Sequence, residues 1–461
     1  MTEGEKAPNL PFGEHNPGCD PTKASGMKVM QPNRTRQSFR LWLLFPILWA
    51  CGPAGNASPG QDPPTIDAPV LHPLPHPVRP GVEVLLSDLL HLVEGRRAGL
   101  ITNHTGIDRL KVSSIDRVVE EPAVELVALF SPEHGIRGEA EAGVGIESSR
   151  DARTGLPIHS LYGNTRKPTP SMLEGLDVLL FDIQDVGTRY YTYVSTMALA
   201  MEAAGEAGIP FLVLDRPNPI GGVAVQGNVL DPAFASFVGL YPLPMRHGMT
   251  PGELARLFVG EFGVQVELGV VPAEGWRREM LFGDTQLPWV PPSPNMPSVE
   301  SALHYPGTCL FEGTNLSVGR GTEMAFQVVG ASWLDGKALA EALTRYGMAG
   351  VRFEAVRFTP RNPGDGKFPD QEIQGVRLIY LDADYDPTMA GLALLVESHR
   401  MSGNRWEWRP GHFDRLAGTD RLRAGVEAGL SLSELREGWD EALEAFLRLR
   451  AGYLLYPASG S

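Results

Sequence analysis

Polar side chains that could do chemistry follow four apolar runs in the first half of the sequence. Because the carboxyl ends of parallel strands meet at one edge of a sheet, side chains at these points are expected to gather there. Carboxylates combined with aromatic rings and arginines are the groups that cleave and hold sugars. The alternative is that strand-end Asp and Asn side chains only cap the helices that follow. The clusters are Asn103 and His104; Glu133 and His134; Asp182, Gln184, Asp185 and Arg189; and Asp215, Arg216 and Asn218.

Other reaction classes lack the sequence signals that they require. The turn after the first run reads Asn103-His104-Thr105-Gly106 without G-x-G-x-x-G, so no nucleotide site is expected. No G-x-S-x-G elbow is present for a serine hydrolase. His104, His134, Asp182 and His247 offer metal-ligand atoms, but none stands in a paired H-x-x-H or H-E-x-x-H motif. We therefore predict no metal and no cofactor.

The elements that position these residues read as an α/β domain over residues 82–287. The apolar runs suit strands that are buried on both faces. Between the third and fourth runs, Val194, Met197 and Met201 recur at helical spacing until Gly208, which predicts a crossover helix. Strand, helix and strand in this order predict a Rossmann-like open parallel sheet.

A second domain of different pattern is expected after a proline-dense joint, LPWVPPSPNMPS. Residues 288–461 mix β-rich runs such as VRFEAVRF with capped helices, so they read as a smaller α+β domain. In the first domain, Thr250 and Glu253 form a capping-box pattern that opens another helix.

The N-terminal segment reads as an export signal. Basic residues precede the apolar run LWLLFPILWA, which is too short for a permanent membrane span, and Cys51 follows it directly. We therefore predict a leader over residues 1–51, with the true start at Met27 or Met30 as an alternative, and a Pro/Gly-rich linker over residues 52–81. A lipid anchor at Cys51 would be the protein's only membrane contact; cleavage after Ala57 is the alternative. Either reading places the protein in the periplasm or cell envelope.

Overall charge restricts the partners. The 461 residues carry a formal net charge of −15, which repels nucleic-acid phosphates and anionic membrane surfaces. Nucleic acid is therefore not expected as a partner, and an anionic substrate would need arginines placed next to it. The oligomeric state is left open.

Long stretches of the sequence resemble the exo-β-N-acetylmuramidase family of glycoside hydrolases. The resemblance covers most of the mature chain and implies an active-site cleft between the two domains, with a glycan derived from peptidoglycan as the substrate. The implied activity is the release of β-1,4-linked N-acetylmuramic acid from the non-reducing end. Hydrolysis of another β-linked amino sugar and a non-catalytic, wall-binding lipoprotein remain as alternatives. The matching stretches include GLITNHTG, LFSPEHGIRGEAEAG, FDIQDVGTRYYTYVST, LDRPNPIGG, MRHGMTPGELA and YPGTCLFEGTNLSVGRGTE.

Within these motifs we assign candidate roles to individual residues. Glu133 is the first choice for the acid that protonates the leaving oxygen, and Asp182, Asp185, Glu312 and Glu323 are candidates for the second group, unless the substrate's own 2-acetamido oxygen attacks. The sugar's lactyl carboxylate needs a guanidinium. Candidates for substrate binding are Arg189, Arg216 and Arg320 for this carboxylate, Tyr190 with its neighbours Tyr191 and Tyr193 for stacking, His104, His134 and His247 as hydrogen-bond organisers, and Asn103, Asn218, Asn315 and Glu312.

Overall fold

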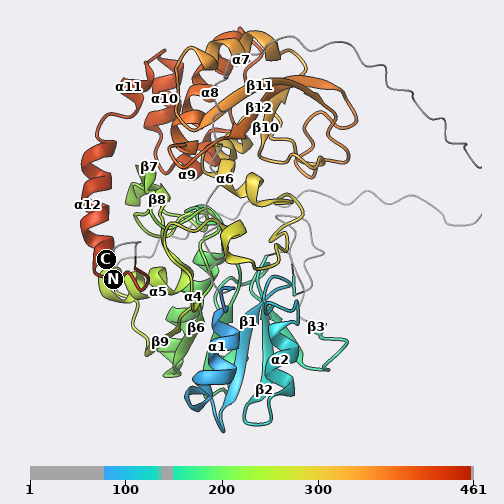
Figure 1. Ribbon diagram of the computed structural model, residues 1–461, viewed down its shortest axis with the longest axis vertical. Coiled ribbons are helices and arrows are strands. Elements are labelled where there is room, and N and C mark those ends of the chain that lie inside the picture. The colour runs from blue at the N-terminus through green and yellow to red at the C-terminus, as the bar shows by residue number, and fades with distance from the viewer. Residues whose placement is uncertain (1–76, 134, 137–148, 458–461) are drawn as a thin grey trace, which may run out of the picture. The chain divides into compact units, whose positions relative to one another are not determined.

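The computed structural model describes residues 77–133, 135–136 and 149–457 of the chain. A seven-stranded sheet dominates the first half, with the strand order β3-β4-β2-β1-β5-β6-β9 (Figure 1). All neighbouring strands are parallel except β3, which runs antiparallel to β4 at the edge. The chain thus begins at the centre and winds outward in both directions, which makes β1 and β5 the switch point of the sheet. The strands are β1 (Arg97–Thr102), β2 (Glu125–Ser131), β3 (Ser149–Arg150), β4 (Pro157–Ser160), β5 (Val178–Asp182), β6 (Phe211–Leu214) and β9 (Leu268–Val271).

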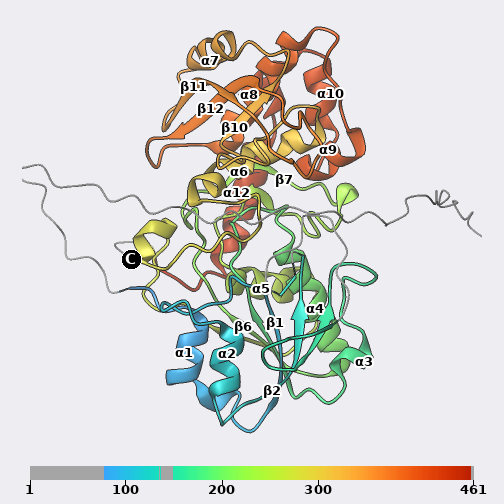
Figure 2. The same ribbon diagram turned by 90° about the vertical axis from the view of Figure 1, so that its right-hand side faces the viewer.

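Helices cover both faces of this sheet, because successive side chains of each strand point to opposite faces. In β5, Val178 and Leu180 pack into one apolar cluster, whereas Leu179 and Phe181 pack into another. Figure 2 shows the first face under α1 and α2, and α3 and α4 on the opposite side. The helices are α1 (Gly81–Asp88), α2 (Ser114–Glu120), α3 (Pro170–Leu173), α4 (Tyr193–Ala207) and α5 (Pro251–Glu261).

Two of these helices begin and end as their sequences predict. The α4 helix buries Val194, Met197 and Met201 and ends at Gly208, whose φ of 70° is readily available only to residues without a Cβ. In α5, the Thr250 side chain accepts from the Glu253 amide while the Glu253 carboxylate accepts from the Thr250 amide. The crossover helix and the capping box are therefore confirmed.

The second half of the chain forms a smaller α+β part around a three-stranded antiparallel sheet, with the order β10-β12-β11. The predicted fold class, a parallel α/β sheet followed by a smaller α+β domain, is confirmed. The described residues also contain a two-stranded β-ribbon, β7-β8, and four 3-10 helices. The remaining elements are β7 (Gln226–Val229), β8 (Pro244–Arg246), β10 (Val328–Ala331), β11 (Val351–Phe358), β12 (Ile373–Tyr380), α6 (Val299–Thr308), α7 (Gly336–Thr344), α8 (Pro387–Ser402), α9 (Pro410–Ala417), α10 (Arg421–Glu427), α11 (Leu432–Leu435), α12 (Trp439–Ala451), η1 (Leu90–Leu92), η2 (Pro232–Phe234), η3 (Phe282–Thr285) and η4 (Cys309–Gly313).

The end of the chain returns to the first half. Helix α12 runs down from the smaller part toward the larger sheet (Figure 1), and the last described residues reach α5. There the Tyr456 hydroxyl donates to Asp215 Oδ2 at 2.6 Å, and the Leu455 amide donates to Glu253 Oε1 at 2.8 Å. The last residues of the predicted C-terminal domain therefore complete the packing of the N-terminal one.

The predicted leader, including Cys51, and the linker up to residue 76 lie outside the described residues. Within the described part, no helix is long and apolar enough to cross a membrane. Cys309 is buried and forms no disulfide with any described residue.

Candidate active site

A cavity of ≈ 580 Å³ lies where the two parts of the chain meet, and both parts contribute to its walls. Residues that follow the carboxyl ends of β4, β2 and β5 line one side, namely Tyr162, Glu133 and Thr192. This is the edge at which open parallel sheets bind their ligands. The other side comes from η4, α9 and the loops around them, including Glu312, Arg320 and His412.

Glu133 is the carboxyl group on the sheet side of the cavity. It lies two residues beyond β2 and is half-buried, and the Thr192 hydroxyl donates to its Oε2 at 2.7 Å. Tyr162 faces the same carboxylate: burial, and then the charge of Glu133, raise the pKa of the Tyr162 phenol far above its usual value. Glu133 is therefore held by neighbouring hydroxyl groups within an aromatic wall.

Tyrosines from the end of the loop between β5 and α4 and from the first residue of α4 form part of this wall. Tyr190, Tyr191 and Tyr193 are all buried and all line the cavity. Tyr193 donates to Pro292 O at 2.6 Å, and Tyr190 donates to Pro306 O, so both hydroxyls tie the loop to the joint and to α6. These tyrosines build the wall from inside the core, so only part of each ring can meet a ligand.

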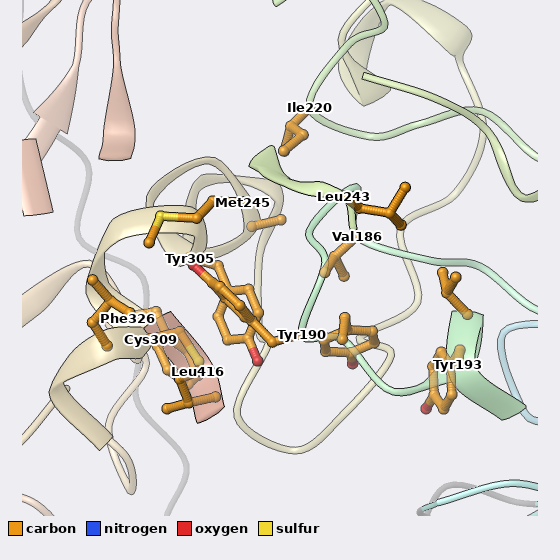
Figure 3. Packing of buried hydrophobic residues seen from close by; sticks show 14 of the residues in the cluster. Val186, Tyr190, Tyr193, Ile220, Leu243, Met245, Tyr305, Cys309, Phe326 and Leu416 are labelled. Atoms are coloured by element: carbon orange, nitrogen blue, oxygen red, sulfur yellow. The ribbon is translucent and has the colours of Figure 1, made fainter. Parts of the chain in front are cut away.

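Aromatic packing continues into the second part of the chain. Tyr305 packs edge-on against Tyr191, with ring centroids 5.7 Å apart, and against Phe326 at 4.7 Å. Figure 3 shows Tyr190, Tyr305 and Phe326 close together, with Leu416 of α9 beside them. The two parts of the chain therefore share one apolar core beneath the cavity.

An ion pair from the second part of the chain also lines the cavity. Arg320 Nε donates to Glu312 Oε1 at 2.8 Å, and one terminal nitrogen of Arg320 contacts the same oxygen. Burial alone would raise the pKa of Glu312, but Arg320, assisted by Lys367 and His412, more than offsets this and holds the pKa below its usual range. Glu312 is thus an ionised carboxylate, and Arg320 Nη1 makes no hydrogen bond to the described residues.

Asp182 and Arg216 do not line the cavity. They pair with each other in the interior: Arg216 Nε is 2.5 Å from Asp182 Oδ1, and the side chains are 4% and 0% exposed. Ser114 donates to the other carboxylate oxygen, and Arg216 also donates to Ile107 O. Because each charge is neutralised and hydrogen-bonded, this pair joins β5, β6 and α2 in a structural role.

Asp185 is also buried, beneath the tyrosine wall. Its Oδ2 accepts from the Gly187 amide at 2.7 Å, and burial raises its pKa to about 7 despite the backbone hydrogen bonds. Its charge contributes to the raised pKa of Tyr191 and Tyr193, so it lies near the cavity without lining it.

Arg189, predicted to bind a carboxylate, instead donates to four backbone carbonyls in the interior. Two of them, Asn228 O and Leu243 O, belong to the first part of the chain, and the other two, Leu416 O and Ala417 O, end helix α9. Burial lowers its pKa to about 10. Arg189 therefore fastens α9 to the first part of the chain.

Other predicted ligands stabilise local structure away from the cavity. Asn103 Oδ1 accepts from the Thr105 amide at 2.9 Å, and His104 Nε2 lies 2.7 Å from Pro291 O. Asn218 donates to Met249 O, and burial lowers the pKa of His247 to about 3, so this ring is neutral.

In the second part of the chain, Asn315 donates to Arg405 O, and Glu323 is exposed outside the cavity lining. His134 lies outside the described residues. Of the predicted site residues, the structure gathers at the cavity Glu133, Tyr190, Tyr191, Tyr193, Glu312 and Arg320.

Several cavity residues were not predicted from the sequence. They include Tyr162, Thr192, Tyr305, Asp365, Arg166 and three residues of α9 and its N-cap: Arg409, His412 and Arg415. The last three recur every third residue, a spacing that places side chains on neighbouring positions of one helix. No group of three His, Cys, Asp or Glu side chains suited to a metal occurs in the described residues.

Comparison with known proteins identifies similar chains over the same two parts. Residues 98–300 match the family model "Exo-beta-N-acetylmuramidase NamZ, N-terminal", and residues 303–456 match its C-terminal counterpart. The peptidoglycan beta-N-acetylmuramidase NamZ of Bacillus subtilis (strain 168) is 47% identical over 381 residues, which cover 82% of this chain and 91% of that protein.

Crystal structures of two DUF1343-family proteins from Bacteroides fragilis are also similar. The first is 37% identical with a TM-score of 0.78, and the match covers 82% of this chain and 99% of that protein. The second is 33% identical with a TM-score of 0.68, and the match covers 83% of this chain and 99% of that protein.

Proposed function

The chain belongs to the exo-β-N-acetylmuramidase NamZ family of glycoside hydrolases, and we propose that its cavity binds the terminal N-acetylmuramic acid of a peptidoglycan-derived glycan and releases it by hydrolysis. The observation that carries this proposal is the pairing, in one aromatic cavity, of a carboxyl group with an arginine. Glu133 comes from the first part of the chain and Arg320 from the second, and both line the cavity.

We assign Glu133 the role of general acid. Glycoside cleavage requires a carboxylic acid that protonates the leaving oxygen. Glu133 reaches the cavity from a strand end, and Thr192 fixes its Oε2 by a hydrogen bond of 2.7 Å. The contact orients the carboxyl group, which can then deliver its proton toward the glycosidic bond.

We assign Glu312 the role of the ionised group that stabilises positive charge at the anomeric carbon. Of the four candidates for the second group, Glu312 alone lines the cavity, and Arg320 keeps it ionised. Asp182 is neutralised by Arg216, Asp185 lies beneath the wall and Glu323 lies outside.

The lactyl carboxylate is assigned to Arg320. Both contacts of Arg320 with Glu312 use one edge of the guanidinium, and Nη1 remains to donate to a second carboxylate. Planar guanidinium groups recognise carboxylates in this way. Tyr305, next to Arg320 and Phe326, supplies a ring for the apolar side of the sugar.

Aryl β-glycosides of N-acetylmuramic acid and N-acetylglucosamine test the proposed function. A hydrogen bond to a charged group contributes about 1.5–3 kcal/mol, so we expect kcat/KM to be roughly 10- to 100-fold higher for the N-acetylmuramic acid glycoside. Equal rates would instead indicate a hydrolase of another β-linked amino sugar. No turnover of either by folded protein would indicate a non-catalytic, wall-binding protein.

We also propose that the protein is exported and anchored through Cys51. The support is the sequence alone: a basic stretch, a short apolar run and the cysteine directly after it. An enzyme of the cell envelope meets peptidoglycan fragments there.

A further inference from the structure

The cavity contains more positive charge than one sugar carboxylate needs. Four arginines and three carboxyl groups line it: Glu312 neutralises Arg320, Asp365 lies 3.7 Å from Lys367, and Glu133 is the proposed acid. Arg166 lies over the Phe237 ring at 4.2 Å. Arg409 and Arg415 make no ion pair and no side-chain hydrogen bond within the described part of the chain. The whole sequence has a net charge of −15, so unpaired arginines in the cavity indicate a site for a specific anion.

These two arginines lie nearer the mouth of the cavity than the Glu312–Arg320 pair. Arg409 and Arg415 are exposed, whereas the side chains of Glu312 and Arg320 are only 16% and 14% exposed. His412 lies between them on the same helix and also faces the cavity. Burial lowers the pKa of His412, which favours its neutral form, so the outer positive charge belongs to Arg409 and Arg415. The cavity therefore has an inner neutralised pair and an outer group made of these two arginines and His412.

The helix that bears the outer group is fixed at both ends. At its start, the Arg409 amide donates to Gly313 O at 2.8 Å, next to Glu312 in the chain. Gly313 lies so close to Phe413 that an added Cβ would come within 2.5 Å of the Phe413 backbone. At its end, Arg189 binds the carbonyls of Leu416 and Ala417. A rigid helix holds a binding site more accurately than a loop does.

We propose that Arg409, His412 and Arg415 form a second carboxylate subsite, which binds the lactyl carboxylate of the next N-acetylmuramic acid, two sugars away from the one released. This inference rests on the proposed function. Peptidoglycan glycans without stem peptides alternate an anionic and a neutral sugar, because the lactyl carboxyl group is then free. Such a glycan with its terminal unit in the cavity presents its next carboxylate toward the mouth, where the exposed Arg409 and Arg415 lie. The subsite makes the enzyme favour longer glycans over disaccharides.

Three substrates distinguish the subsite from the inner site: the aryl glycoside, the disaccharide and the tetrasaccharide with two N-acetylmuramic acid units. In the double variant Arg409→Gln/Arg415→Gln, kcat/KM for the tetrasaccharide should fall about tenfold more than for the aryl glycoside. Exposed arginine contacts contribute less than buried ones, which sets this modest size. Arg421→Gln, an exposed arginine outside the cavity, is the matched control and should change neither value.

A tetrasaccharide whose second lactyl carboxylate is a methyl ester provides the converse test, because it offers no charge to the subsite. The kcat/KM values of wild type and double variant should then differ no more on this substrate than on the disaccharide. Calorimetry then measures the dissociation constant of the unmodified tetrasaccharide for the Glu133→Gln protein, with and without the two arginine changes. Because the proposed acid is absent from this protein, the measurement reports binding at the subsite without turnover. Equal losses on all three substrates would assign these arginines to the released sugar and overturn the proposal. An unchanged dissociation constant would show them to be solvated surface charges. Absence of turnover by wild type would refute the proposed function separately.

Discussion

Exchange of Glu133 for Gln removes the proton that the leaving oxygen requires and changes little else. An amide oxygen can still accept the Thr192 hydroxyl, so the hydrogen bond of 2.7 Å and the side-chain position are retained. General acid–base help contributes roughly 10² to 10⁴-fold in rate, or about 3 to 5 kcal/mol of barrier. We therefore expect kcat on the disaccharide to fall by that factor while the melting temperature changes little.

The leaving group provides an internal check. An aryl group departs with less protonation than a sugar hydroxyl, so Glu133→Gln should lose less activity on the aryl glycoside than on the disaccharide. Thr192→Val removes only the orienting hydroxyl and should cause a smaller loss, about tenfold. Glu174→Gln, an exposed glutamate outside the cavity, serves as the matched control.

Kinetics of the purified variants on both substrates decide the matter. Equal losses on the two substrates would identify Glu133 as nucleophile or orienting base. Near-normal activity would show that Glu133 is structural, and the acid would then have to be sought among the other cavity carboxyls.

Three further changes probe the inner arginine, a buried carboxyl and the anchor. Arg320→Lys keeps the charge beside Glu312 but loses the planar fork, so KM for the N-acetylmuramic acid glycoside should rise about tenfold; an unchanged KM would remove Arg320 from carboxylate binding. Burial raises the pKa of Asp185 from 3.8 to about 7, so the folded state binds this proton more tightly than the unfolded chain and the free energy of unfolding falls as pH rises between these values. Asp185→Asn should therefore gain stability relative to wild type with rising pH, by on the order of 4 kcal/mol at most, as read from urea unfolding at pH 5 and pH 8; a difference independent of pH would contradict this sign. Cys51→Ser should move the protein from the membrane fraction to the soluble one, and unchanged fractionation would reject lipidation.

The sequence was sufficient to place polar residues at the carboxyl edge of the sheet, but not to tell which of them face the cavity. Apolar runs that end in polar residues correctly indicated a parallel sheet, and the strand ends before Glu133 and Thr192 do reach the cavity. The same pattern also marked Asp182 and Arg216. These two turn toward each other because a buried charge is costly unless it is paired. Position in the sequence does not indicate whether a strand-end carboxylate will face the cavity or pair with a cation in the interior.

The C-terminal side of the cavity was less accessible to sequence reasoning. Glu312 and Arg320 were found because they stand in family motifs, but Arg409, His412 and Arg415 come from a helix more than a hundred residues beyond the parallel sheet. Their spacing is equally typical of a solvated helix face. Only the packing of α9 against η4 and its attachment through Arg189 bring them to the cavity.

The return of the chain end to the larger sheet affects the order in which the protein can be completed during synthesis. Tyr456 binds Asp215 across 241 positions of sequence. At typical elongation rates of 5–20 residues per second, the ribosome needs roughly 10 to 50 s to add that length. Throughout this interval the nascent N-terminal half lacks the residues that cover α5 and Asp215. This part of the N-terminal half can therefore complete its packing only after the last residues of the chain have emerged.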